Sequence, residues 1–258
     1  MTNQHRGPRL AAYLIASCAA LALAGCDTVG GWFGGGGEPP LPGQRVSVMS
    51  VDKRIEVDSR AAGRPLSYGA PSSNVDWPQA GGAPDHAMGH LALSANPQPA
   101  WSVDIGSGSS GGLPLLGTPV IAGGVLAASD AEGVAATFDA RSGARRWSVS
   151  VRPEKERGDA PGGGVALDGG KLFVGTGYAE VLALNVADGS ILWRKRVSGP
   201  VRGAPTVVGG KVYVLTLDNQ VVALSAEDGG LLWSHSGIIE SAGLLGGNSV
   251  AVGSGLVA

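Results

Sequence analysis

Residues 169–193 read GGKLFVGTGYAEVLALNVADGSILW, and residues 209–233 repeat the pattern as GGKVYVLTLDNQVVALSAEDGGLLW. Each copy runs from a Gly-Gly turn through two apolar runs to an acidic-Gly turn and a tryptophan. A weaker copy, GGVLAASDAEGVAATFDARSGARRW, occupies residues 123–147. Self-similarity at about 40 residues, with apolar runs of strand length and no helical period, indicates the four-stranded antiparallel blades of a β-propeller. The sequence therefore predicts an all-β fold.

Four tryptophans mark the same point of the repeat: Trp101, Trp147, Trp193 and Trp233 stand 46, 46 and 40 residues apart. This point should lie on the outermost strand of each blade. Burying such a ring between blades removes some 150–250 Å² from water, so we expect a structural role. The alternative, stacking on a cofactor or sugar, would require a ligand site in every blade.

The two clear copies predict eight strands. We expect these at 165–168, 171–176, 180–185, 190–197, 205–208, 211–216, 220–225 and 230–235. The run at 212–215 (VYVL) is apolar on both faces, as expected when a blade is sandwiched between two neighbours. The hairpin turns before the tryptophans end in Gly143, Gly189 and Gly229, where glycine adopts a left-handed conformation without strain. Replacing these glycines should reduce stability.

A fourth copy is expected to open at residues 246–258, GGNSVAVGSGLVA, with its final run at 255–258 aligned to the third strand of the other copies. At the other end, residues 99–106 (PAWSVDIG) match only the last strand of a repeat. Propellers commonly let an N-terminal strand complete the C-terminal blade, which removes open sheet edges. The segment around Trp101 is thus expected to belong to the last blade. Because the final run of about four residues is short for a strand that must pair on both sides, we expect an open, C-terminally truncated arc. The family that the repeats resemble has eight blades, which implies that about half of the ring is present. The alternative is a closed four-bladed ring in which residues 99–105 pair with residues 255–258.

Composition and charge limit the possible functions. The chain has 44 Gly, 16 Pro and 43% hydrophobic residues, which is typical of a turn-rich β protein with a sizeable core. Its net charge is −2, and the basic residues form no run. The sequence therefore offers no electrostatic footprint for nucleic acid.

The N-terminus predicts a lipid anchor. Basic residues precede an apolar stretch at 10–24, which is followed by Gly25 and Cys26. At about 15 residues this stretch suits the core of a signal peptide better than a membrane span. We expect residues 1–25 to be cleaved and Cys26 to be acylated, with palmitate in the anchor. The alternative is an ordinary secretory signal. Cys18 would leave with the signal, so the mature chain would hold a single cysteine and no internal disulfide.

Residues 26–75 predict a flexible, Gly- and Pro-rich tether and lead-in, and residues 76–258 the partial propeller. Within the tether, residues 45–57 alternate well enough for one strand. Trp32 and Phe33 are either an aromatic membrane anchor or exposed linker residues, with equal support.

The turns and tryptophans, as in LNVADGSILWR (184–194), resemble the pyrroloquinoline-quinone (PQQ) repeat, whose hallmark is an Asp- or Thr-Gly turn followed by Trp. With the anchor signal and the lead-in DWPQAGGAPDHAMGH (76–90), the chain is similar to the BamB-like lipoproteins of the outer-membrane β-barrel assembly (BAM) machinery. The resemblance implies a non-catalytic scaffold without cofactor or metal. It also implies binding to the periplasmic part of a BamA-like barrel subunit, to other BAM components and to nascent outer-membrane proteins. Asp27, the residue after the lipid-bearing cysteine, departs from the pattern of outer-membrane lipoproteins, because an aspartate at this position retains lipoproteins in the inner membrane. Placement in the inner membrane is therefore the alternative.

Two other function classes share parts of this pattern. A quinone-dependent dehydrogenase would hold its cofactor and a calcium ion in the central channel, but Asp188, Glu227 and Asp228 fall in hairpin turns and no cysteine pair is present. A periplasmic binding or sensor propeller shares every repeat feature. Asp85, His86 and His90 are the nearest approach to a metal site, but Pro84 and Gly89 disfavour a helix and no glutamate follows His86. The zinc-protease pattern is therefore absent, and we expect surface or capping residues. The charged loop at 151–163 is either a docking loop or a solvated one.

We predict that Cys26→Ala releases the protein from membranes, because the acyl chains are the expected anchor. Fractionation after a high-salt wash measures this. Retention of the variant in the membrane fraction would place the anchor elsewhere, and flotation of the wild type with inner membranes would show that Asp27 acts as a retention signal.

Overall fold

The computed structural model describes residues 58–60, 63–65, 67–201, 203–238 and 249–258. The chain divides into two compact units, Met1–Pro65 and Leu66–Ala258. In the first unit, the Arg60 guanidinium lies 3.1 Å from the Asp58 carboxylate. The second unit contains the repeats. The strand expected at 45–57, the signal segment and Cys26 lie outside the described residues.

The described repeats form three four-stranded antiparallel sheets, each with its strands in sequence order. Blade 1 consists of β1 (Val120–Ala122), β2 (Val125–Ser129), β3 (Val134–Asp139) and β4 (Arg145–Ser150). Blade 2 consists of β5 (Gly164–Asp168), β6 (Lys171–Gly175), β7 (Glu180–Asn185) and β8 (Ile191–Arg196). Blade 3 consists of β9 (Thr206–Val208), β10 (Lys211–Leu215), β11 (Gln220–Ser225) and β12 (Leu231–Ser236). The eight strands predicted in blades 2 and 3 are confirmed to within one residue at each end.

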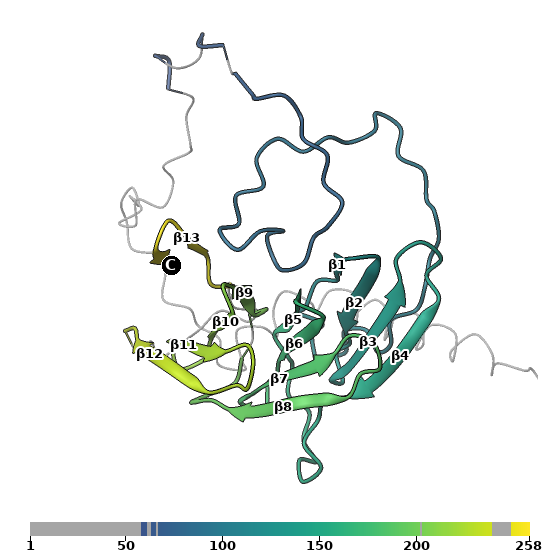
Figure 1. Ribbon diagram of the computed structural model, residues 1–258, viewed down its shortest axis with the longest axis vertical. Coiled ribbons are helices and arrows are strands. Elements are labelled where there is room, and N and C mark those ends of the chain that lie inside the picture. The colour runs from purple at the N-terminus through teal and green to yellow at the C-terminus, as the bar shows by residue number, and fades with distance from the viewer. Residues whose placement is uncertain (1–57, 61–62, 66, 202, 239–248) are drawn as a thin grey trace, which may run out of the picture. The chain divides into compact units, whose positions relative to one another are not determined.

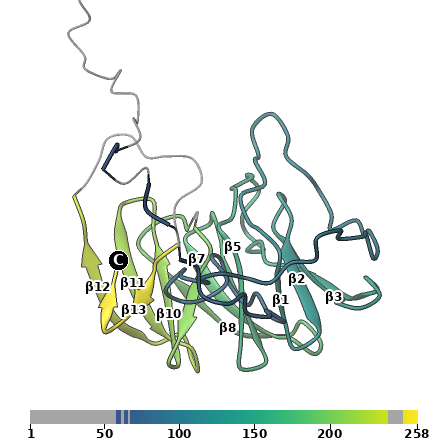
Figure 2. The same ribbon diagram turned by 90° about the horizontal axis from the view of Figure 1, so that it is seen from above.

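The blades stand side by side as an open arc, with β1, β5 and β9 on its concave side and β4, β8 and β12 on its convex side (Figure 1). Figure 2 shows the same succession from above, from β1 to β12. The middle strands are apolar on both faces because each blade is covered by its neighbours. The burial of β6 and β7, each with four consecutive fully buried residues, confirms that expectation.

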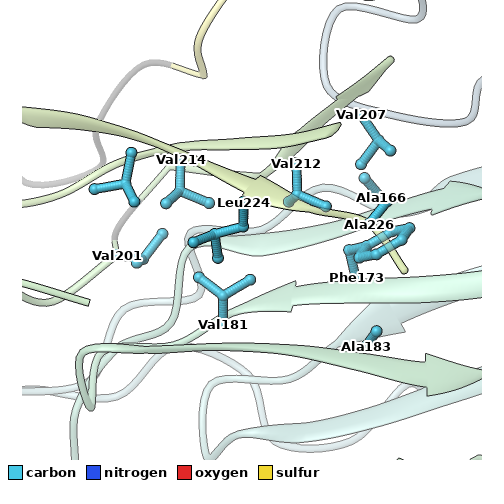
Figure 3. Close-up of a cluster of buried hydrophobic side chains, with 11 residues drawn as sticks. Ala166, Phe173, Val181, Ala183, Val201, Val207, Val212, Val214, Leu224 and Ala226 are labelled. Atoms are coloured by element: carbon cyan, nitrogen blue, oxygen red, sulfur yellow. The ribbon is translucent and has the colours of Figure 1, made fainter. Parts of the chain in front are cut away.

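Two hydrophobic clusters hold the blades together. One joins blades 2 and 3 through Phe173, Val181, Val214 and Leu224, all of them almost completely buried (Figure 3). A second cluster joins blades 1 and 2 through Val120, Ala127, Leu172 and Leu182 and other residues of their facing sides. Full burial of one such large side chain contributes about 1.5–3 kcal/mol. The blade interfaces are therefore the cores of this unit.

A second contact links the blades near the convex rim. Trp147 Nε1 donates to the Val186 carbonyl at 2.8 Å, and Trp193 Nε1 donates to the Ala226 carbonyl at 3.3 Å. Each ring also lies against a glycine of the next blade, three residues after the residue whose carbonyl accepts the hydrogen bond. A Cβ on Gly189 or Gly229 would be 2.7 Å from Cε3 of the indole. We call this arrangement the tryptophan latch. For Trp147 and Trp193 it confirms a structural role on the outermost strand of a blade, whereas Trp233 on β12 is 37% exposed.

Trp101 makes the same latch with blade 1. Its Nε1 donates to the Ala140 carbonyl at 3.2 Å, and its ring lies over Gly143. Residues 99–105 thus occupy the place that β4 takes beside blade 2, although they form no strand. They form no ladder with residues 255–258, since Leu256 and Val257 pair only with Val252 and Gly253. The closed four-bladed alternative is therefore wrong, and the partial propeller is an open arc.

The expected alignment of the fourth copy is also wrong. The last residues form a hairpin of β13 (Val252–Gly253) and β14 (Leu256–Val257). Its turn residues, Ser254 and Gly255, have φ values of 51° and 77°, and the Gly209-Gly210 turn between β9 and β10 has 60° and 71°. Residues 251–258 therefore correspond to the first two strands of a blade, with Ser254 in place of the first turn glycine. Because a serine stands where the other copies have glycine, the sequence pattern did not identify this turn as the one between the first and second strands.

We predict that Gly189→Ala destabilises the protein more than Gly169→Ala, by about 1–3 kcal/mol. Both glycines lie in blade 2 with positive φ, 77° and 53°, so each variant loses about 1–2 kcal/mol to backbone strain. Only Gly189 also faces a tryptophan ring, whereas a Cβ on Gly169 would meet open space. Urea unfolding of the two variants measures the difference. Equal losses would show that the latch contributes only through the turn conformation.

Candidate functional site

The concave side of the arc carries a segment of the chain that precedes the blades. Residues 76–84, which we call the inner strap, run along the first strand of successive blades. Trp77 and Ile121 of β1 exchange two backbone hydrogen bonds of 2.6 and 2.8 Å, in an antiparallel bridge. Leu167 N of β5 donates to the Pro78 carbonyl at 2.7 Å. The strap thus provides the neighbour that an inner edge strand otherwise lacks.

Gln79 continues this pairing to blade 3 with its side chain. Its Oε1 accepts from Val207 N of β9 at 2.7 Å, and its Nε2 donates to the Val207 carbonyl at 3.4 Å. The side-chain amide therefore replaces the peptide group of a paired strand. Gln79 is 4% exposed, so both of its polar atoms depend on these two partners.

The strap ends at the terminal hairpin. Val252 N of β13 donates to the Pro84 carbonyl at 2.7 Å. Within nine residues, the chain has therefore hydrogen-bonded to β1, β5, β9 and β13 in turn. The amino-acid sequence identified this stretch only as an ordered lead-in, because a buried glutamine that pairs with a distant backbone has no sequence signature. Its role appears only in the folded chain.

A hollow of about 340 Å³ lies beside the strap, between blades 1 and 2. Its lining is mostly apolar and includes Pro78, Leu167 and the turn glycines of both blades. Two carboxylates reach it, Asp76 and Asp168, and the Asp76 Oδ1 accepts from Gly123 N at 3.1 Å. Lys171, the one cation in the lining, donates to Glu227 at 2.7 Å in the next blade. Asp76 and Lys171 are therefore bound to partners in the fold, and Asp168 is exposed, so the lining offers no converging polar set for a ligand.

The three residues considered for a metal do not converge. Asp85 Oδ1 accepts from Ala87 N at 3.1 Å and caps the turn. His90 Nδ1 lies 2.8 Å from the Gly69 carbonyl, and the His86 ring packs against Gly81. In the part of the chain that the structure describes, no three His, Cys, Asp or Glu side chains are close enough together to hold a metal ion.

The acidic turn residues lie where the sequence placed them. Asp188 and Asp228 are in the hairpins before β8 and β12, near the convex rim. Hydrogen bonds from Ser190 lower the pKa of Asp188, and the Ser225 hydroxyl is the main cause that lowers the pKa of Asp228. In blade 1, Arg146 and then Ser142 lower the pKa of Asp139 to about 2. These carboxylates stabilise turns and do not point toward the concave side.

The charged loop at 151–163 connects β4 to β5 and projects past β8 (Figure 1). Its base is closed by an ion pair of 2.7 Å between Arg152 and Asp159, and by Tyr178, whose hydroxyl donates to the Gly158 carbonyl at 2.9 Å. The Arg152 guanidinium also lies 6.0 Å from the Tyr178 ring centre. Glu154, Lys155, Glu156 and Arg157 at the tip are mostly solvent-exposed. The loop is ordered at its base and charged at its tip.

Comparison with known proteins identifies the repeats. The family model described as "Outer membrane protein assembly factor BamB" matches residues 131–258, from blade 1 to the last residue. Residues 131–258 are BamB-like PQQ repeats. The BamB protein of Escherichia coli (strain K12) is 33% identical over 115 residues, which cover 43% of this chain and 29% of that protein. The BamB protein of Xanthomonas campestris pv. campestris is 26% identical over 191 residues, 72% of this chain and 37% of that protein.

The BamB-like repeats are shared with enzymes. A quinoprotein ethanol dehydrogenase of Pseudomonas aeruginosa is 31% identical over 118 residues, 43% of this chain and 19% of that protein. The crystal structure of a quinohemoprotein alcohol dehydrogenase from Comamonas testosteroni superposes with a TM-score of 0.52 at 26% identity, over 62% of this chain and 27% of that one. This chain spans about a third of the length of its curated BamB relatives.

Two further findings concern the membrane. Within the described ranges, no helix combines the length and the hydropathy needed to cross a bilayer. The expected lipid attachment at Cys26 lies outside these ranges and stays a prediction.

We predict that Gln79→Ala destabilises the protein by about 1–3 kcal/mol, because the buried N–H and C=O of Val207 lose their partner. Urea unfolding measures the loss, and faster hydrogen exchange at the Val207 amide locates it. Gln98→Ala is the matched control, since Gln98 is exposed and contacts only Asn96 nearby. Equal stability of the two variants would mean that the strap does not hold blade 3.

Proposed function

We propose that this chain acts as a non-catalytic lipoprotein scaffold of the outer-membrane β-barrel assembly machinery. The observation that carries the proposal is the match of residues 131–258 to the BamB family, in a fold whose concave edge is occupied by its own strap. In this role the protein binds the periplasmic part of the BamA-like barrel subunit and other BAM components. It thereby helps to deliver nascent outer-membrane proteins.

A scaffold of this kind needs rigid, exposed surfaces rather than a reactive cavity. The latches and the strap fix the blades on the convex and concave sides of the arc. Loops and outer strands are then presented in fixed positions, which reduces the entropy that binding would otherwise cost. The convex rim and the loop at 151–163 are the surfaces that remain open to a partner.

A quinone-dependent dehydrogenase is the second candidate, because relatives with that activity share the repeats at similar identity. Such an enzyme holds its quinone and a calcium ion at the centre of the propeller, with carboxylate and amide oxygens on the metal. Among the residues that the structure describes, the acidic turn residues and Gln79 do not fit these groups. Asp188 and Asp228 bind the backbone of hairpin turns at the rim, and the amide of Gln79 in the strap is directed at blade 3, where it is bound to Val207.

The proposed attachment is an acylated Cys26 in the outer membrane, with the tether of residues 26–75 between the lipid and the blades. The names of the curated relatives support the outer membrane. A periplasmic sensor or binding lipoprotein is the alternative that shares the same repeats. The two differ in partner, because only the scaffold requires the barrel subunit.

We predict that the full-length wild-type lipoprotein, purified from detergent-solubilised membranes, brings the barrel subunit with it. Mass spectrometry of the purified complex measures this, with an unrelated lipoprotein as the control. Absence of the barrel subunit from the complex would favour the sensor. Incubation with the quinone and calcium should produce no alcohol-dependent dye reduction, and turnover above background would establish the dehydrogenase instead.

A further inference from the structure

A groove on the convex rim separates blade 2 from blade 3. It has a volume of about 170 Å³ and lies between β8 on one side and β11 and β12 on the other. Val222, Leu224 and Leu231 form an apolar floor and wall, and Lys195, Arg196, Gln220 and Ser234 add polar atoms. Leu231 is 57% exposed, although Val222 and Leu224 beneath it are buried. We call this feature the outer groove.

The equivalent space between blades 1 and 2 is filled. There the Arg194 guanidinium of β8 forms an ion pair with the Glu180 carboxylate of β7, and it also donates to the Val151 carbonyl at 3.1 Å. The two side chains are 28% and 12% exposed. On the blade 1 side, Val149 lies against Gly189, where an added Cβ would be 3.0 Å from its Cγ2. An ion pair and a valine thus close the first interface.

The repeat register shows what replaces these three residues in the second interface. In the sheets, Arg194 pairs with Leu182 as Ser234 pairs with Val222, and Glu180 begins β7 as Gln220 begins β11. Val149 follows its latch tryptophan by two residues, as Lys195 follows Trp193. The second interface therefore has a small hydroxyl in place of the arginine, a neutral amide in place of the carboxylate and an ammonium in place of the valine. The groove is open and cationic because of these exchanges.

The carboxylates near the groove already have partners. Asp228 lies close enough to Lys195 for the ammonium to contribute, as the weakest cause, to the lowered pKa of that carboxyl. Its Oδ1 accepts from Gly230 N at 3.0 Å. Asp218 accepts from Gln220 at 3.0 Å and from the Ser198 hydroxyl at 3.2 Å. Among the residues that the structure places, neither Lys195 nor Arg196 has a carboxylate within ion-pair distance.

We propose that the outer groove docks an extended segment of a protein partner, which places an aliphatic side chain on Leu231 and Val222 and a neighbouring carboxylate beside Lys195. The groove holds about five or six waters at the roughly 30 Å³ that each occupies in the liquid, which is the size of one side chain rather than of a free ligand. A recess of this size on an exposed rim suits the anchor residue of a larger partner. Lys195 is half-buried, and its positive charge selects for an acidic neighbour. This inference rests on the proposed scaffold function and assigns its contact surface.

The test measures binding of the full chain to the purified periplasmic region of the barrel subunit. In the closing variant, Gln220→Glu with Ser234→Arg, the groove receives the ion pair that fills the first interface. We expect the dissociation constant to rise about tenfold or more, because the anchor side chain is excluded. The control is Glu180→Gln with Arg194→Ser, which opens the first interface and should leave binding unchanged. Thermal unfolding of both variants verifies that they fold.

A second measurement detects the partner's carboxylate beside Lys195 directly. Carbodiimide cross-linking of the wild-type complex should join Lys195 to an Asp or Glu of the partner, identified by mass spectrometry, and Lys195→Val should lose this product and bind about threefold to tenfold more weakly. If the wild type binds but the closing variant binds equally well and no Lys195 product forms, the groove is not the docking site and the scaffold function stands. If the wild type does not bind at all, both proposals are wrong.

Discussion

The indole N–H of Trp147 donates to a carbonyl of blade 2, and the indole of Trp193 does the same to blade 3. Each contact requires a glycine with positive φ, because a Cβ at that position would collide with the ring. The latch therefore combines a hairpin conformation, a hydrogen bond and the burial of a large ring in one small area. Since it recurs at the same point of every described blade, it sets the spacing of the convex rim. The rest of the arc depends on that spacing.

On the concave side, hydrogen bonds from the inner strap hold the blades in place of the latch. The inner strap pairs with the first strands through backbone groups at Trp77, Pro78 and Pro84, and through a side-chain amide at Gln79. Inner strands have free N–H and C=O groups on one edge, and such edges pair readily with other chains. By covering them, the strap removes a site of unspecific association with other chains.

The three blades share one backbone but differ on their rims. In blade 1, Arg145 stands at the position of Leu231 in blade 3, lies over the Phe138 ring and donates to the Asp104 carbonyl. In blade 2, the Arg194 and Glu180 pair stands at the positions of Ser234 and Gln220. Blade 3 has neither arrangement and leaves a cationic groove. In a repeat protein, buried positions must stay alike because each blade packs on the next, whereas rim positions are free to vary. Differences between repeats at equivalent rim positions are therefore a physical guide to where a partner binds.

The sequence alone determined the repeat, the strand limits of blades 2 and 3, the placement of the tryptophans on the outermost strands and the relation to PQQ repeats. These features are local or periodic: apolar runs of strand length, turn glycines and a tryptophan at constant spacing leave a direct trace in the order of residues.

Tertiary structure decided the other features. The fourth copy was misaligned because Ser254 replaces a glycine, and the separate hairpin of β13 and β14 confirms the open arc that the sequence favoured over a closed ring. Gln79 is 128 residues away from Val207, and the outer groove exists only because residues from adjacent blades face each other. Contacts of that kind depend on how the blades are placed in space, which no spacing in the sequence records.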